Sequence, residues 1–131
     1  MAIFSSTEKM YEVLGTLWRD LLSEEETGKK FQEAGIVIRF SVHSPDGELW
    51  LFPDREEKVV CGKADGKPDV EMFLSGDDCH KFWMQELKLP IALATRKIKA
   101  KGPINKILKL LPMLKPAYEK YPEIAKKHGI I

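Results

Sequence analysis

The segment from Asp69 to Leu114 constrains the fold most strongly, because it predicts a strand, a helix, a second strand and an apolar helix in close succession. Residues 69–74 alternate with the period of two that is typical of a half-buried strand. Ser75 is a favourable N-cap for the helix that follows. Lysines alternate with Ile and Ala over 97–101, which predicts the second strand, and apolar residues then cover much of the circumference of a short helix over 104–111. This segment therefore carries more apolar surface than its neighbours need.

Two helices are predicted before the first strand. Apolar residues recur at steps of three and four from Tyr11 to Leu22, which is typical of one face of a helix of about five turns. Ser5 and Glu8 have the spacing of a capping box at its start, and Ser23 begins a second capping box. Gly35 is expected to end the second, short helix.

Three more strands are predicted at residues 36–42, 48–52 and 57–62, with residues 44–47 as the turn between the first two. The order of elements predicts an α+β fold, in which helices cover one face of a mostly antiparallel sheet. Residues 1–131 are most simply one domain, and residues 115–131 are expected to form a polar helical extension punctuated by prolines.

Composition and charge argue against several classes of protein. A net charge of +1 gives no reason to expect nucleic acid as a partner. No apolar run approaches the roughly 18 residues of a membrane span. Two cysteines without an export signal predict a reducing cytoplasm. Lysines dominate from Lys97 to Lys127, which favours a solvated helix face first and transient contact with an anionic membrane surface second.

No group of residues predicts catalysis, and we expect neither a metal nor a cofactor. His43, His80 and His128 have no ligand spacing and are expected to lie on the surface. Asp77 and Asp78 suit the positive end of a helix dipole and need no metal to explain them. Cys79 lies on an apolar helix stripe, where a buried cysteine behaves as a small hydrophobic residue. The sequence therefore predicts a protein that is not an enzyme.

The aromatic and methionine residues have two interpretations that composition cannot separate, because core residues and the walls of an apolar pocket are the same types. Trp50 and Phe52 are expected on the outer face of their strand. They favour an alternative function, a dimeric interaction or accessory domain without a cavity, in which these two residues form the contact patch.

Several local motifs follow one another in a characteristic order. They are the Gly66–Asp69 turn that leads into Val70–Ser75, Asp77-Asp78 at a helix start, Ile91–Ala94 before the strand 97–101, and the apolar helix after it. In these motifs the chain resembles the sterol carrier protein type-2 family of lipid-binding domains. This resemblance implies a five-stranded sheet covered by helices, with a hydrophobic tunnel between them. It also implies a long-chain ligand, which in this family is a fatty acid, acyl-CoA, sterol or phospholipid.

The resemblance and the inward positions together predict the residues that line the tunnel. Lysines near its mouth, Lys97, Lys101 or Lys106, are expected to meet the head group of the ligand. The predicted lipid-binding residues are Leu14, Trp18, Phe40, Met72, Phe82, Trp83, Ile98, Ile104, Leu108 and Leu111.

Overall fold

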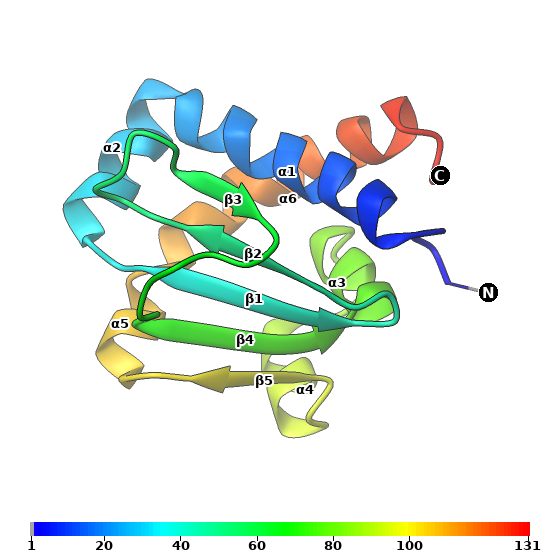
Figure 1. Cartoon of the computed structure of the whole chain (residues 1–131). Helices are drawn as coiled ribbons and strands as arrows, with labels where there is room; N and C mark the ends of the chain where they lie inside the picture. Colours follow the sequence, from blue (N-terminus) through cyan, green and yellow to red (C-terminus); the bar gives the residue numbers. More distant parts are fainter. Residues whose placement is uncertain (1) are drawn as a thin grey trace.

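The computed structural model describes residues 2–131 and forms a five-stranded mixed sheet with helices packed on one side (Figure 1). The predicted α+β fold is confirmed. In chain order the elements are α1 (Thr7–Ser23), α2 (Glu25–Ala34), β1 (Ile38–His43), β2 (Gly47–Leu51), β3 (Val59–Cys61), β4 (Val70–Ser75), α3 (Gly76–Trp83), α4 (Leu89–Ala94), β5 (Ile98–Lys101), α5 (Ile104–Leu108) and α6 (Leu111–Lys127).

The strand order is β3-β2-β1-β4-β5, and the mostly antiparallel pairing expected from the sequence is present. The central pair β1 and β4 is parallel, whereas β1–β2, β2–β3 and β4–β5 are antiparallel. Parallel strands need a long crossover connection. Here the crossover contains β2, β3 and a loop that passes in front of the sheet (Figure 1).

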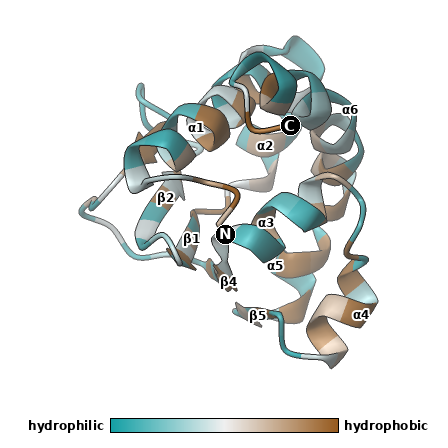
Figure 2. Cartoon of the chain, turned by 90° about the vertical axis from the view of Figure 1, so that its right-hand side faces the viewer, coloured by the Kyte–Doolittle hydropathy of each residue, from teal (hydrophilic) through white to brown (hydrophobic). Residues whose placement is uncertain are grey.

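The helices lie on one side of the sheet and form the second layer of the domain. In Figure 2, α3, α4, α5 and α6 lie to the right of the strands. Helix α1 crosses the upper part of the molecule in front of α6 (Figure 1). The core lies between these layers and includes Leu17, Leu21 and Val70, which are fully buried.

The helix caps correct two details of the sequence prediction. The N-cap of α1 is Ser6 rather than Ser5, and its Oγ accepts a hydrogen bond from the Lys9 backbone N–H at 3.0 Å. Ser23 still belongs to α1, so its hydroxyl donates to the Asp20 carbonyl and does not cap α2. Gly35 ends α2 in the left-handed conformation, as predicted, with φ of 62°.

Helix α6 differs from the polar, punctuated extension expected at residues 115–131. Residues 111–127 form one helix although Pro116 and Pro122 lie inside it. Its inward side is part of the core, since Ala117, Tyr121 and Ala125 are fully buried. The charged residues of this segment predicted a polar extension, but they occupy only the side of the helix that faces away from the core.

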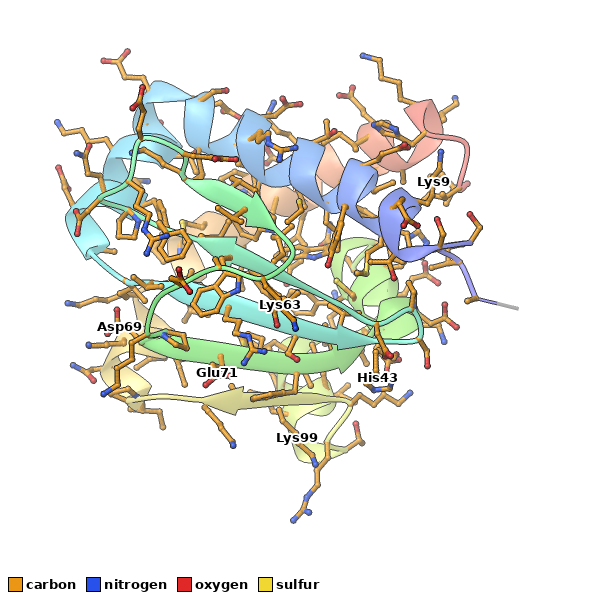
Figure 3. All side chains as sticks on the ribbon, in the orientation of Figure 1. Lys9, His43, Lys63, Asp69, Glu71 and Lys99 are labelled. Carbon is orange, nitrogen blue, oxygen red and sulfur yellow. The ribbon has the colours of Figure 1, made fainter. Side chains whose placement is uncertain are left out.

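The outer face of the sheet carries an ion-pair network. Cross-strand pairing places Arg39 between Trp50 on β2 and Glu71 on β4. The Arg39 guanidinium donates to Glu48 at 2.6 Å and to Glu71 at 3.0 Å, and these bonds help raise its pKa. Glu71 lies on the face toward the viewer in Figure 3.

Trp50 and Phe52 do not form the exposed contact patch that the alternative interpretation required. The two rings stack at 5.5 Å, and only 5% and 3% of the residues' surfaces are exposed. The Arg55 guanidinium lies 3.6 Å above the Phe52 ring, and Gly66 packs against the edge of that ring. The loops after β2 and after β3 therefore help to cover these aromatic residues.

Candidate binding cavity

An apolar cavity lies between the sheet and the helices. Its floor comes from the inward residues of β1, β4 and β5, and its other walls come from α1, α3 and the segment from α4 to α6. Every side chain that lines it is apolar or weakly polar. These side chains are Trp18, Ile38, Phe40, Met72, Leu74, Cys79, Phe82, Trp83, Leu89, Ile98, Ile107, Leu110, Leu111, Met113 and Leu114.

Strand register brings the floor residues together. Phe40 on β1 is the direct partner of Met72 on β4, and Leu74 is the partner of Ile98 on β5. Since side chains alternate between faces, Ile38 and Phe40 point to the same side. The period of two that predicts the strands therefore also builds the floor.

Aromatic rings form one wall of the cavity. Trp18 stacks on Phe40 at 5.7 Å and meets Trp83 edge-on at 5.6 Å. Phe82 packs against Trp83 at 4.8 Å and against Tyr118 at 5.6 Å. Such offset and edge-on arrangements contribute about 0.5–1.5 kcal/mol per pair beyond burial, which stabilises this wall.

The cavity is small in this structure. Its volume is about 50 Å³, counted as the space that the centres of water-sized molecules can occupy. One water needs about 10–15 Å³ by this measure, so the cavity has room for a few water-sized molecules and not for a long chain. A long-chain ligand therefore requires one wall to move outward. Helix α5 is the wall that we expect to move, because it contains no buried residue and so little packing opposes its displacement.

Seven of the predicted tunnel residues line the cavity: Trp18, Phe40, Met72, Phe82, Trp83, Ile98 and Leu111. Leu14 is buried but does not line it. Ile104 and Leu108 point to solvent and are 76% and 55% exposed. Ile104, Ile107 and Leu108 cover much of the circumference of α5, but a one-turn helix presents only one side to the cavity, and that side carries Ile107.

The prediction missed eight lining residues: Ile38, Leu74, Cys79, Leu89, Ile107, Leu110, Met113 and Leu114. Ile38 and Leu74 share the strand faces of Phe40 and Met72, and Cys79 shares the helix face of Phe82, so the sequence contained the signal for these three. Leu89 and Met113 reach the cavity only through tertiary packing.

One ion pair connects α5 to the sheet. Lys106 Nζ lies 3.0 Å from Asp69 Oδ1, and Asp69 Oδ2 accepts a hydrogen bond from the Val37 backbone N–H at 2.9 Å. This backbone bond, together with Lys106, lowers the pKa of Asp69. Figure 3 shows Asp69 at the end of the sheet that adjoins α5. Lys101, expected near the mouth, instead lies over the Phe73 ring at 5.3 Å on the outer face.

His80 is buried, which corrects its predicted surface position. Its Nδ1 shares a hydrogen bond with the Tyr121 hydroxyl at 2.7 Å, and the Phe4 ring packs edge-on against it. Burial lowers the pKa of His80 and raises the pKa of Tyr121. The pair joins α3 to α6, so it positions two cavity walls.

The residues around the cavity offer little chemistry. Burial raises the pKa of the Cys79 thiol to about 12, so the thiolate nucleophile is scarce at neutral pH. Within residues 2–131, no group of three or more His, Cys, Asp and Glu side chains has a geometry that could hold a metal ion. No helix in that range is both long enough and apolar enough to span a membrane.

Comparison with known proteins places this geometry in a family. The model of the SCP-2 sterol transfer family matches residues 17–115. Hydroxysteroid dehydrogenase-like protein 2 of Mus musculus is 28% identical over 109 residues, which are 82% of this chain and 21% of the mouse protein. The chain thus spans about a fifth of that relative's length.

Two solved structures share the fold. The sterol carrier protein domain 2 of Helicoverpa armigera has a TM-score of 0.70 and 20% identity, with 88% of this chain and 91% of that chain covered. Sterol carrier protein 2 of Aedes aegypti, solved in complex with palmitate, has a TM-score of 0.57 and 13% identity, with 86% and 97% covered. Since the family model spans well over half of its residues, the chain belongs to the SCP-2 sterol transfer family.

Proposed function

We propose that the protein binds and carries one long-chain lipid in the cavity between the sheet and the helices, without catalysing a reaction. The observation that carries the proposal is a cavity lined only by apolar or weakly polar side chains, whose floor and other walls come from different elements. The palmitate bound by the Aedes aegypti protein of the same fold supports a fatty acyl chain as the ligand class.

The energetics favour a long chain over a short one. Each buried methylene contributes about 0.8 kcal/mol, so ten contribute about 8 kcal/mol. Association costs an estimated 4–15 kcal/mol, and ordering side chains adds to this. A chain of ten or more methylenes is therefore needed to offset the cost, which fits a fatty acid, acyl-CoA, sterol or phospholipid better than a small metabolite.

The absence of enzymatic activity is also part of the proposal. The cavity walls present no acid or base, and the one thiol there is held protonated by burial. The match to the dehydrogenase-like mouse protein covers only a fifth of that protein, which is too little to assign its activity to this chain.

Cys61 and Cys79 are free thiols, which supports the reducing cytoplasm as the location.

The alternative of a dimeric accessory domain has less support. The residues that would form its contact patch, Trp50 and Phe52, are buried in the monomer. A concentration-dependent dimer in sedimentation, together with no lipid binding, would favour that alternative over the carrier.

Two adjacent residues of α5 provide a matched test. Ile107 lines the cavity, whereas Leu108 is exposed. A fluorescent long-chain fatty acid is titrated into wild-type protein, Ile107→Glu and Leu108→Glu in solution. We expect Ile107→Glu to weaken binding at least tenfold, because a carboxylate enters the apolar site, and Leu108→Glu to bind like wild type. Equal affinity of all three proteins would contradict the cavity as the binding site.

A further inference from the structure

Exposed aliphatic side chains gather in one part of the molecule. Within residues 2–131, six large hydrophobic residues are exposed, and five of them fall between residues 91 and 111. These five belong to α4, α5 and the first position of α6, and we call them the aliphatic cluster: Ile91, Leu93, Ile104, Leu108 and Leu111. A concentration of apolar surface in water marks an interaction site.

The same segment carries charge of one sign. No acidic residue occurs from Leu87 to Tyr118, whereas eight basic residues do. Two of these, Lys99 and Lys101, lie on the edge strand β5, where lysines commonly prevent edge-to-edge pairing. The other six adjoin the aliphatic cluster in sequence: Lys88, Arg96, Lys97, Lys106, Lys109 and Lys115. Of the six, only Lys106 has an acidic partner, Asp69.

The two helices that carry most of the aliphatic cluster lie at opposite ends of the edge strand β5, on the same side of the sheet (Figure 1). Helix α4 precedes β5 and α5 follows it, so the edge strand connects them directly. Both lie on the helical side of the sheet, near its β5 edge, and their ribbons show hydrophobic colouring there (Figures 1 and 2). Apolar and basic residues thus flank the edge strand at both of its ends.

We propose that this surface docks onto an anionic lipid bilayer. Aliphatic side chains that enter the interface, with lysines beside them that meet anionic head groups, are the features of interfacial membrane binding. A second copy of the chain fits poorly, because a two-fold interface would set this basic surface against itself. Nucleic acid fits poorly as well, since the exposed apolar residues are aliphatic and offer no ring for base stacking.

The docking surface adjoins the cavity, and in this respect the inference rests on the proposed lipid carriage. Helix α5 turns Ile107 toward the cavity and Leu108 toward solvent. Leu111 is 43% exposed and also lines the cavity. A bilayer bound at this surface would therefore lie directly outside α5, a cavity wall that contains no buried residue.

The test measures co-sedimentation with vesicles of phosphatidylcholine alone or with about one third phosphatidylserine. The main variant replaces Lys97, Lys109 and Lys115 by Gln. Each basic residue near an anionic surface contributes about fivefold in affinity, so we expect a loss of about 100-fold. The matched control replaces three other lysines by Gln in the same way: Lys29, Lys126 and Lys127, which are exposed on α2 and α6. This control variant should bind vesicles like the wild type.

The paired α5 variants separate docking from lipid carriage. Leu108→Glu should lose vesicle binding and keep fatty acid binding in solution, whereas Ile107→Glu should do the reverse. If fatty acid binding is absent but vesicle binding follows this pattern, the carrier function fails and the docking surface stands.

Four results would overturn the docking surface. These are no binding of wild-type protein to anionic vesicles, equal binding by the two lysine variants, tighter binding to an oligonucleotide than to vesicles, or a solution dimer that Leu108→Glu dissociates.

Discussion

Removal of the Tyr121 hydroxyl should destabilise the protein although the ring stays in place. Tyr121 is fully buried and shares its hydrogen bond with His80, which is itself 7% exposed. Tyr121→Phe leaves the His80 Nδ1 atom buried without a partner, which costs about 1–3 kcal/mol. At about 2.1 cal/mol/K per residue, the 131-residue chain should lose about 4–11 °C in melting temperature.

A double-mutant cycle makes this prediction specific to the hydrogen bond. His80→Phe alone should also destabilise, because it leaves the Tyr121 hydroxyl buried and unpaired. The double variant leaves no unpaired polar group, so its loss should be smaller than the sum of the two single losses by about 1–3 kcal/mol. The assay is urea denaturation followed by tryptophan fluorescence. Additive losses would refute the claim that this pair joins α3 to α6.

Two further predictions concern stability. Burial lowers the pKa of His80 more than the nearby Glu86 and Asp77 raise it, so the unfolded state binds more protons once the pH falls below about 6.5. Stability should therefore decline below that pH, and the His80→Phe/Tyr121→Phe variant should decline less; equal pH profiles would contradict the role of His80. Gly102→Ala should lower the free energy of unfolding more than Gly129→Ala does. Both glycines have positive φ, but only at Gly102 would an added Cβ lie 2.6 Å from a backbone oxygen, that of Asp69. Urea midpoints measure the difference, and equal losses would show that the close approach is unimportant.

Local periodicity allowed much of the fold to be predicted. The alternation around Phe40 and Met72 predicted two strands and the face that each of them buries. Ser75 was predicted as an N-cap, and its Oγ accepts a hydrogen bond from the Asp78 backbone N–H at 3.0 Å. These features depend on residues close in sequence, so the sequence specifies them directly. The parallel pairing of β1 with β4 depends on a crossover of many residues, and no local pattern encodes it.

The errors concern contacts between distant elements. His80 looked exposed because its burial depends on Tyr121, 41 residues away. Leu108 looked like a cavity residue because apolar residues cover much of the circumference of α5, and only the position of the sheet decides which of them turns inward. Pro116 was expected to punctuate the C-terminal segment, yet α6 runs through it and packs against α1 and α3.

Native mass spectrometry of protein purified from its own host tests the central claim most directly. The carrier function predicts a population with the mass of one added lipid per chain, and organic extraction of that population should release a long-chain lipid. Ile107→Glu should lack this population, and Leu108→Glu should retain it. A wild-type protein that carries no lipid, and that gains none when incubated with long-chain fatty acid, would contradict the account.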